Sequence, residues 1–347
     1  MAAVADNLLG VYMPSEKLIS IVTPMHNHRK YIPRTVEAIL NQTYQNWEWI
    51  ICDDCSKDGS YEYMLDVAKY EPRMKVLHNE VNQKIVITTQ RCMDAAKGEY
   101  MYILDSDDYC APEYLTRMAS ILDKDPNVAV AFSRCYTMDK EDGYWGAWPT
   151  KPNFKHSGVK EFWHQLLSYS MKGTTTLYRM NHAKEIGGWQ AHPLIRMHDK
   201  YFDLRMLLCG DVAYIDEPLG YYRIHDTNHS SDKDEQIIPA VAEEVFGMVD
   251  DLMARVPENP YYKVEDLRKE ANAQYVGYIS HLICLAESKG KTEYAQELMD
   301  MLAKRGYKRT DPIEGPKMEK AINIVRPMIK KMTYKKLPPL QERFAAA

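Results

Sequence analysis

The sequence predicts an α/β fold, with a mostly parallel sheet flanked by helices and a C-terminal all-helical extension. Three observations support this prediction. Short β-branched or aromatic runs alternate with segments of helical periodicity up to about residue 135. Polar loops rich in aspartate come directly after two of these apolar runs. Beyond residue 232, apolar residues recur at helical spacing only.

The first predicted unit is a strand at 19–22, a loop that begins at Thr23-Pro24, and a helix at 31–42. The same order recurs, with strands predicted at 47–52, 74–78, 100–104 and 128–133 and helices at 60–70, 87–97 and 112–122. Gly98 is the predicted C-cap of the helix before it. Because such sheets bind ligands at the carboxyl ends of their strands, the loops after these strands form the candidate site.

The amino-acid composition changes after Tyr136, and the regular periodicity ends there. The stretch "EDGYWGAWPTKPNFKHSG" is rich in Gly, Pro and Trp, and it predicts a long loop at the mouth of the site. Farther on, 271–290 and 292–306 predict an αα-hairpin. We therefore predict four regions: an N-terminal extension (1–16), two halves of one α/β domain (17–135 and 136–232), and a helical region with a basic tail (233–347).

Composition indicates a globular chain. Its 347 residues are 45% hydrophobic and 27% charged, which is enough to bury a substantial core. With 44 basic against 49 acidic residues, the net charge of −5 gives no overall basic field, so nucleic acid is not an expected partner. The seven cysteines are odd in number and scattered, which predicts reduced thiols rather than a disulfide framework.

The two ends of the chain bear on localisation. The first residues show no basic region followed by an apolar run, and no run of 18 apolar residues occurs, so we expect a cytoplasmic chain without a membrane span. The tail at 316–347 holds eight basic and two acidic residues among Ile, Met, Tyr and Leu. This pattern suits peripheral contact with the inner face of an anionic membrane. A solvated helix face explains it equally well.

The strongest chemical signal is the run Asp105-Ser106-Asp107-Asp108, directly after an apolar strand. Clustered carboxylates repel one another unless a cation or hydrogen-bond donors are present. Mg²⁺ and Mn²⁺ bind carboxylate and diphosphate oxygens, so the run suggests a metal–nucleotide site. An ordinary Asp/Ser turn is the alternative.

The stretch "ICDDCSKDGS" (51–60) holds a Cys-x-x-Cys around two aspartates. Zinc would need two further Cys or His ligands, and no second Cys-x-x-Cys exists. Two aspartates between the thiols would also raise the pKa values of the thiols and blunt redox chemistry. We expect the chemistry to lie in Asp53 and Asp54, with Cys52 and Cys55 as packing.

Three motifs in this order resemble the family 2 glycosyltransferases. These are "TPMHN" (23–27), "CDDCSKDGS" (52–60) and "GEYMYILDSDD" (98–108), against family patterns close to T-P-x-Y-N, V-D-D-G-S-x-D-G-S and G-E-Y-x-x-x-L-D-x-D-D. Weaker likeness extends through "IGGW" (186–189), "HDKYFDLRML" (198–207) and "PLGYYRIH" (218–225). The resemblance covers about two thirds of the chain and leaves the helical tail outside.

The resemblance implies a GT-A fold with a nucleotide-sugar-binding half and an acceptor-binding half. It implies that Asp54 accepts a hydrogen bond from the base. It also implies that His26 takes the place of a tyrosine that lies against the base. The alternative is that His26 is an ordinary loop residue. Asp105 would hold the ribose, Asp107 the metal, and Asp53 the ribose or a neighbouring basic group. The resemblance also implies that Pro24, Asn27 and Ser106, which lie in the same motifs, contact the nucleotide.

Two late motifs would supply the remaining groups. Asp199 matches the family's acceptor-activating base, while His198 stands where the family has Glu; a helix cap is the alternative for Asp199. His225 would close over the nucleotide and ligate the metal, or be a structural loop histidine. Arg223 would meet a phosphate or form a structural ion pair.

The function implied is Mn²⁺- or Mg²⁺-dependent, inverting transfer of a hexosyl or N-acetylhexosaminyl group from a nucleotide sugar, with UDP favoured, to a hydroxyl of a glycan or lipid-linked saccharide. Trp145 and Trp148, and with less support Trp189 and His198, are the candidate acceptor contacts, with core packing as the alternative. A nucleotidyltransferase is a rival, although "TPMHNHRKY" lacks the glycines of a phosphate loop. A non-catalytic nucleotide-sugar-binding protein is another.

Overall fold

The computed structural model describes residues 16–167, 169–189, 198–225, 238–256, 263–310 and 335–336. These residues belong to two compact units. The first holds the described residues up to 225 together with 335–336, and the second holds 238–256 and 263–310. The predicted boundary at 135–136 falls inside a strand of the first unit, and the one at 232–233 lies outside the described residues.

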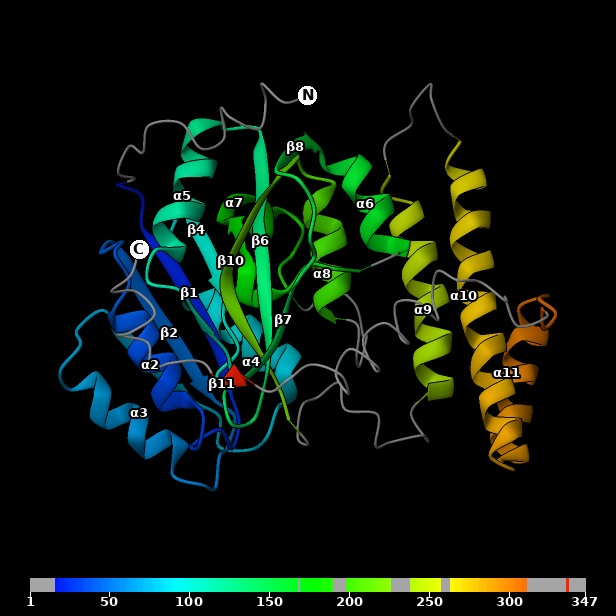
Figure 1. The fold of residues 1–347 in the computed structure, drawn as a ribbon, viewed down its shortest axis with the longest axis horizontal. Helices are drawn as coiled ribbons and strands as arrows, with labels where there is room; N and C mark the ends of the chain where they lie inside the picture. Colours follow the sequence, from blue (N-terminus) through cyan, green and yellow to red (C-terminus); the bar gives the residue numbers. More distant parts are fainter. Residues whose placement is uncertain are drawn as a thin grey trace. The chain divides into compact units, whose positions relative to one another are not determined.

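The first unit is built on four parallel strands, as predicted, and their order is β4-β1-β2-β3. Their bounds are β1 Ile19–Met25, β2 Trp47–Asp53, β3 Met74–His78 and β4 Tyr100–Ile103. The β1 and β2 strands are apolar runs buried along nearly their whole length, which is typical of parallel strands covered on both faces. Figure 1 shows these strands in blue and cyan.

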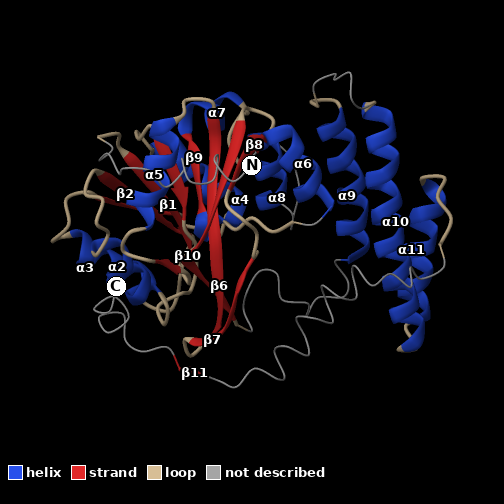
Figure 2. Ribbon diagram, turned by 45° about the horizontal axis from the view of Figure 1, so that its top comes forward, coloured by secondary structure: helices blue, strands red, loops and turns tan. Residues whose placement is uncertain are grey.

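The sheet continues with strands of mixed direction. Strand β9 (Thr176–Arg179) pairs antiparallel with β4 and with β6 (Val128–Asp139). Strand β10 (Asp211–Ile224) runs parallel to β6 along its length, with bulges near Pro218, and Figure 2 shows these two long strands next to each other. Two short strands, β5 (Tyr109–Cys110) and β8 (Phe154–Ser157), pair antiparallel with β10.

Helices cover both faces of this sheet. Residues Ile19, Ile21, Trp49 and Ile51 pack in one apolar cluster with α2 (Ile32–Leu40) and α5 (Tyr114–Lys124). Alternate residues of a strand point to opposite faces, and α4 (Lys84–Ala95) contacts β1 and β2 from the other face. The remaining helices of the unit are α3 (Ser60–Ala68), α6 (Gly158–Leu167), α7 (Met180–Glu185) and α8 (His198–Leu207).

The predicted long loop at 141–158 is wrong. Strand β6 runs on to Asp139, a turn with Asp142 at φ 63° follows, and β7 (Gly143–Trp148) returns antiparallel to β6. Glycines at 143 and 146 interrupt the alternation of large side chains in β7. Because of this interruption, the sequence pattern did not predict a strand here. Lys335–Lys336 (β11) pairs with β7. The rest of the basic tail lies outside the described residues.

Gly98 is not the C-cap that the sequence predicted, because α4 ends at Ala95. A Cβ at Gly98 would lie 2.6 Å from the Ser20 nitrogen and 2.7 Å from the Leu18 oxygen. The Gly98 N–H also donates a hydrogen bond of 2.8 Å to the Ser20 hydroxyl. Glycine is therefore required here by close approach of the chain to the start of β1.

The second unit contains three helices among its described residues: α9 (Ile238–Met253), α10 (Val264–Ser288) and α11 (Thr292–Lys304). The predicted αα-hairpin is confirmed, since α10 and α11 are joined by residues 289–291 with Gly290 at φ 71°. Phe246, Ile279, Ile283 and Leu298 are the centre of its apolar core. Among the described residues, no helix is both long enough and apolar enough to cross a membrane.

Candidate active site

The polar loops meet at one edge of the first unit's sheet. Strands β1, β2 and β4 are parallel neighbours, so the loops after them leave the sheet at the same edge. The Asp54 N–H donates to the Met25 oxygen at 2.7 Å, which ties the first two loops together. The end of β10 reaches the same place, because Arg223 is hydrogen-bonded to Asp107 and Asp108.

The three carboxylates of the 105–108 run have different environments. Burial and the charges of Asp107 and Asp199 raise the pKa of Asp105 to about 7, against the opposing charge of Lys172. Burial also raises the pKa of Asp108 well above its usual range. For Asp107 burial acts in the same direction, but the hydrogen bond from His225 and the electrostatic attraction of the His28 and His225 imidazoles outweigh it and lower the pKa. Of the three carboxyl groups, Asp107 therefore ionises most readily.

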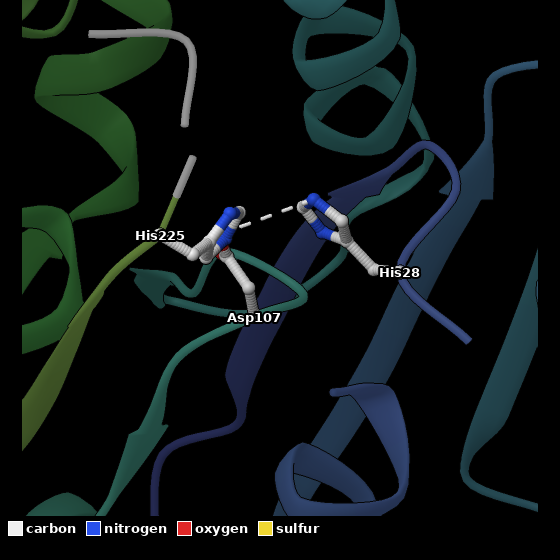
Figure 3. Close-up of side chains that lie close together, drawn as sticks. All are labelled: His28, Asp107 and His225. Carbon is white, nitrogen blue, oxygen red and sulfur yellow. Dashed lines mark hydrogen bonds and ion pairs between the residues drawn. The ribbon is translucent and has the colours of Figure 1, made fainter. Parts of the chain in front are cut away.

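Two imidazoles face the Asp107 carboxylate. His225 Nε2 lies 2.8 Å from Asp107 Oδ2, and His28 Nε2 lies 4.0 Å from the same oxygen (Figure 3). The His225 ring also stacks on Tyr31 with ring centres 4.7 Å apart. Burial is the main cause that lowers the pKa of His28, which favours its neutral, metal-binding form.

This group of side chains fits a divalent cation. One ligand atom from each of His28, Asp107 and His225 can be chosen so that all lie within 4.8 Å of one another. The sequence predicted Asp107 and His225 as metal ligands, and the structure brings these two together. It did not predict His28. The signal was present in the sequence, because His28 follows His26 by two residues in the first polar loop.

Asp105 differs from its neighbours in being partly exposed. Among the described residues, no side chain or backbone group is hydrogen-bonded to its carboxylate. The backbone of the run is fixed all the same, because the Thr35 hydroxyl donates to the oxygens of Ser106 (3.1 Å) and Asp108 (2.7 Å). The Asp105 carboxylate thus extends from a fixed backbone with its acceptor positions open. Ser106 is buried, and its hydroxyl is 2.7 Å from His28 Nδ1.

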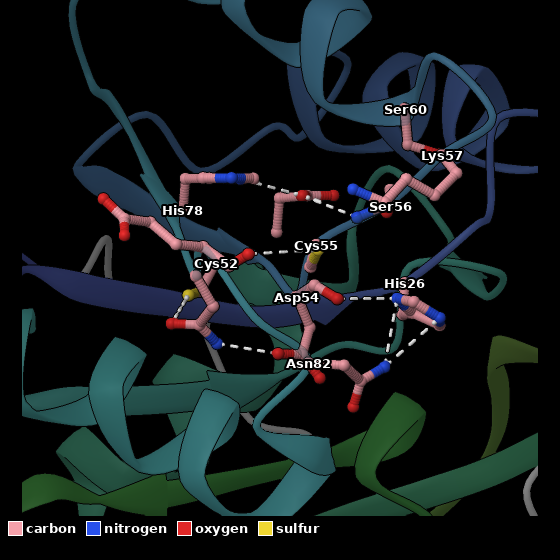
Figure 4. Close-up of polar contacts among 12 residues, drawn as sticks. His26, Cys52, Asp54, Cys55, Ser56, Lys57, Ser60, His78 and Asn82 are labelled. Carbon is pink, nitrogen blue, oxygen red and sulfur yellow. Dashed lines mark hydrogen bonds and ion pairs between the residues drawn. The ribbon is translucent and has the colours of Figure 1, made fainter.

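Asp54 is the centre of a hydrogen-bond network (Figure 4). Its Oδ1 accepts from Asn79 Nδ2 at 2.8 Å and from the Gln83 N–H at 2.7 Å, and its Oδ2 accepts from the Lys84 N–H at 2.9 Å. The carboxylate therefore lies at the N-terminal end of α4, where the helix dipole favours negative charge. Three of its four lone pairs are used, so one acceptor position, on Oδ2, is left for a ligand.

The tautomer of His26 follows from its partners. Its Nδ1 lies 2.7 Å from the Asp54 carbonyl oxygen, which can only accept, so Nδ1 carries the proton. Its Nε2 then accepts from the Asn27 amide at 2.9 Å. Asn27, at φ 55°, also bonds across to the second loop through Ser56 and Lys57. His26 is exposed at the edge of the sheet in one fixed orientation, whereas Pro24 is buried in β1.

Asp53 is fully buried. Its Oδ2 accepts a hydrogen bond from the Ser56 N–H at 3.0 Å and lies 3.0 Å from His78 Nδ1. Of the two roles expected for Asp53, the structure shows contact with a neighbouring basic group. Cys52 is buried as well. Cys55 has a backbone φ of 62°, and its thiol donates a hydrogen bond to the Glu80 carbonyl oxygen at 3.3 Å. Both thiols are free, as predicted.

Arg223 does not point toward solvent. It is 3% exposed, its Nε donates to the Asp107 oxygen at 2.9 Å, and its Nη1 donates to the Asp139 oxygen at 3.1 Å. Its Nη2 forms an ion pair of 2.7 Å with Asp142. All three guanidinium nitrogens therefore have protein partners. The ion pair with Asp142 is the structural contact that was the alternative for Arg223.

Asp199 lies in the first turn of α8 and is partly exposed. Its charge acts on Asp105 and on Asp203, one turn further along the helix. Asp203 is buried and accepts hydrogen bonds from Tyr178 (2.5 Å) and Tyr169 (2.7 Å). The tyrosine pair thus anchors the helix that carries Asp199 close to the 105–108 run.

The candidate acceptor residues fall into two groups. Trp189 is 6% exposed and packs against Phe202 with ring centres 4.8 Å apart, and His198 is 8% exposed beside it. Packing in the core therefore accounts for Trp189 and His198. Trp145 and Trp148 are half-buried in β7, and the Lys172 ammonium lies 5.4 Å from the Trp148 ring. Of the four candidate acceptor residues, Trp145 and Trp148 are therefore the two that keep a partly exposed side chain.

Comparison with known proteins agrees with this arrangement. Residues 20–187 match the family Glycosyl transferase family 2. TuaG of Bacillus subtilis (strain 168), named as a teichuronic acid biosynthesis glycosyltransferase, is 29% identical over 217 residues, which cover 62% of this chain and 82% of TuaG. The glycosyltransferase GlyG of Streptococcus pneumoniae serotype 4 is 36% identical over 139 residues, covering 40% of this chain and 46% of GlyG.

Solved structures share the fold. Residues 1–349 of TarS from S. aureus, in complex with UDP-GlcNAc, superpose with a TM-score of 0.56 at 15% identity, covering 86% of this chain and 95% of that one. The mannosyltransferase PcManGT from Pyrobaculum calidifontis, in complex with GDP-Man and Mn²⁺, gives 0.51 at 14% identity, covering 87% and 92%. At these identities the likeness concerns the fold alone. The fold is the predicted GT-A fold, and with the match over residues 20–187 it identifies the chain as a glycosyltransferase similar to those of glycosyl transferase family 2.

Proposed function

We propose that this enzyme transfers a sugar from a nucleotide diphosphate to a hydroxyl group by direct displacement, with inversion at the anomeric carbon. The observation that carries the proposal is the meeting of Asp105, Asp107 and Asp199 at the carboxyl edge of the sheet. The charge of Asp199 acts on Asp105, so base and nucleotide loop are close enough for one bound donor to span them. Carboxylates whose charges act on one another suit a cation and a polyhydroxylated ligand.

UDP is the donor nucleotide that we favour. Oδ2 of Asp54 has one open acceptor position, and a uracil base offers an imide N–H donor there. Two hydrogen bonds fix the orientation of the His26 ring near this position. In this orientation a face of the imidazole would lie against the base. TarS, bound to UDP-GlcNAc, supports UDP, while PcManGT, bound to GDP-Man, keeps GDP open.

Asp105 and Asp107 would contact the rest of the donor. The open carboxylate of Asp105 can accept hydrogen bonds from ribose hydroxyls. Asp107, His225 and His28 would hold a divalent cation, Mn²⁺ or Mg²⁺, which supplies charge to balance the diphosphate that leaves. Arg223 stabilises these three side chains indirectly, because its Nε donates a hydrogen bond to the Asp107 backbone oxygen.

Asp199 would act as the general base. It removes the proton from the acceptor hydroxyl, the oxygen attacks the anomeric carbon from the face opposite the diphosphate, and the bond to the diphosphate breaks. The anchoring of Asp203 by Tyr169 and Tyr178 keeps α8 in place during this step. A base that is already held in its reactive orientation lowers the barrier, because no entropy has to be lost to orient it in the transition state.

The acceptor we propose is a saccharide, as in the synthesis of a polysaccharide or glycoconjugate. The half-buried faces of Trp145 and Trp148 offer a surface on which sugar rings stack. The name of TuaG, a glycosyltransferase of teichuronic acid biosynthesis, supports a polymer of this kind. Contact of the basic tail with a membrane surface stays a prediction, because nearly all of that tail lies outside the described residues.

The test is nucleotide release from UDP-, GDP-, dTDP- and CMP-sugars with Mn²⁺ or Mg²⁺. We expect one donor class to be turned over, with Asp107→Ala and Asp199→Asn both inactive. Only Asp107→Ala should also lose metal-dependent nucleotide binding, measured by calorimetry. Full transfer by Asp199→Asn would contradict the base assignment, and a product of retained configuration would contradict direct displacement.

A further inference from the structure

We infer that His28 makes the cation site of this enzyme selective for first-row transition metals over Mg²⁺. This inference rests on the proposed metal-dependent transfer, and it concerns which ion the site prefers. The observation is a group of one carboxylate and two imidazoles that come from three separate segments of the first unit. His28 follows β1, Asp107 follows β4, and His225 directly follows β10.

His28 is oriented as metal-binding histidines are. Its Nδ1 lies 2.7 Å from the Ser106 hydroxyl, within the same run that carries Asp107. When Nδ1–H donates to this hydroxyl, the lone pair of the imidazole is on Nε2, which is the nitrogen that faces Asp107 Oδ2 (Figure 3). A hydrogen bond at the distal nitrogen fixes the tautomer and ring orientation of a ligating histidine. Ser106 thus serves as the outer partner of His28.

The distances suit one small ion. Ligands about 2.1 Å from a metal lie roughly 3 to 4 Å apart. The separation of His28 Nε2 from Asp107 Oδ2 is 4.0 Å, and that of His225 Nε2 from Asp107 Oδ2 is 2.8 Å. Ring centres of the two histidines lie 5.8 Å apart and the rings are nearly perpendicular, at 88°. Small rotations of the side chains would place all three atoms around one centre.

The burial of the group limits how much water the ion can keep. The side chains of Asp107 and His225 are 9% and 2% exposed, and that of His28 is 20% exposed. Mg²⁺ gives up its waters reluctantly and prefers oxygen ligands in an octahedron. Imidazole nitrogens suit later first-row ions, and the affinity of such sites rises from Mn²⁺ to Co²⁺. Two nitrogens and one oxygen in a partly dry site therefore disfavour Mg²⁺.

The test is calorimetric titration of the full chain with MnCl₂, CoCl₂ and MgCl₂, without nucleotide. We expect wild type to bind Co²⁺ more tightly than Mn²⁺, and Mn²⁺ at least tenfold more tightly than Mg²⁺. His28→Ala should weaken Mn²⁺ binding by about ten- to a hundredfold, with a much smaller change for Mg²⁺. His28→Glu replaces nitrogen by oxygen at similar reach, so it should restore binding but narrow the ratio of Mn²⁺ to Mg²⁺ affinity.

His26→Ala is the matched control, because His26 lies in the same loop and its nitrogens bond to Asp54 and Asn27, outside the group. Its metal affinities should equal those of wild type. Asp107→Ala separates the two proposals. Retained metal binding in Asp107→Ala would contradict the proposed cation site itself. Lost binding in Asp107→Ala with unchanged affinities in His28→Ala would overturn only the inference about His28.

A second readout does not depend on the folding of a variant. Electron spin echo modulation of Mn²⁺ bound to wild type, with and without ¹⁵N-labelled histidine, counts the coordinated imidazoles. Two histidine nitrogens are expected. One histidine nitrogen, or equal affinities for Mg²⁺ and Mn²⁺ in wild type, would overturn the inference.

Discussion

The backbone N–H of Arg223 donates a hydrogen bond of 2.8 Å to Oδ1 of Asp108. The other carboxylate oxygen, Oδ2, is hydrogen-bonded to the Thr174 hydroxyl. Asp108 thereby joins three segments, namely the run that carries Asp107, the turn at 173–175, and the end of β10 that carries His225. Since both oxygens are used inside the protein, Asp108 positions other groups rather than contacting a ligand.

The first prediction concerns Asp108. Asn keeps an acceptor for the Arg223 N–H and offers a donor to the Thr174 hydroxyl, and it resembles the neutral acid that a raised pKa favours. We therefore expect Asp108→Asn to fold with nearly wild-type stability and to bind metal. Asp108→Ala leaves two buried polar groups without a partner and should lose about 2–5 kcal/mol. Urea unfolding measures the difference, and equal losses in both variants would contradict this role.

The second prediction concerns Asp54. Asn at this position presents an amide N–H₂ toward one of three donors, namely Asn79 Nδ2 and the N–H groups of Gln83 and Lys84. Two facing donors repel, so Asp54→Asn should lose about 1–3 kcal/mol of unfolding free energy as well as nucleotide affinity. Calorimetry with UDP and urea unfolding measure the two effects.

Asn82→Ala is the control for Asp54. The Asn82 side chain is exposed, and it bonds to the Lys84 N–H and to His26. Its loss should cost under about 1 kcal/mol. A stable Asp54→Asn variant would show that the N-terminal end of α4 does not depend on this carboxylate.

The third prediction uses two glycines with opposite surroundings. Gly98→Ala would push a methyl group against backbone atoms of Leu18 and Ser20, so we expect it to lose about 1–3 kcal/mol. Gly247 lies within α9, and a Cβ there would meet nothing within 4 Å. Gly247→Ala should therefore gain about 0.5–1 kcal/mol from helix propensity. Thermal unfolding of both variants gives the sign, and a stable Gly98→Ala would contradict the close approach.

Much of this arrangement could be predicted from local patterns. The alternation of apolar runs and helical segments gave the parallel strands β1 to β4, because buried strands and amphipathic helices have distinct periods. The 105–108 run could be recognised because carboxylates seldom cluster without a reason. Asp107 and His225 lie together as predicted, although 118 residues separate them.

Other features depend on contacts that no local pattern records. His28 is oriented by a contact with Ser106, and Arg223 is held by contacts with Asp139 and Asp142. In each case the deciding partner comes from a distant segment. The strand β7 was missed for a different reason, because glycines hide its alternation and tertiary pairing with β6 decides the outcome.

The last prediction concerns pH and Asp203. Burial raises the pKa of Asp203 to about 7, while the hydrogen bonds from Tyr178 and Tyr169 oppose the shift. In the unfolded chain the same carboxyl ionises near pH 4. Between these values the unfolded chain releases a proton that the folded protein keeps, so this group stabilises the fold less and less as pH rises from about 4 to about 7, and its contribution is constant above that.

Asp203→Asn removes this dependence and keeps the size of the side chain. Relative to wild type, the variant should therefore be more stable at pH 8 than at pH 5, by about 2–3 kcal/mol, whatever constant cost the altered hydrogen bonds add. Urea unfolding at the two pH values measures this change, and the other titrating groups, including Asp105, cancel because they are present in both proteins. Tyr169→Phe is the control: it removes one donor to Asp203, which should raise the pKa of Asp203 further and enlarge the loss of stability between pH 5 and pH 8. An identical difference between Asp203→Asn and wild type at pH 5 and pH 8 would show that Asp203 is ionised in the folded protein throughout this range.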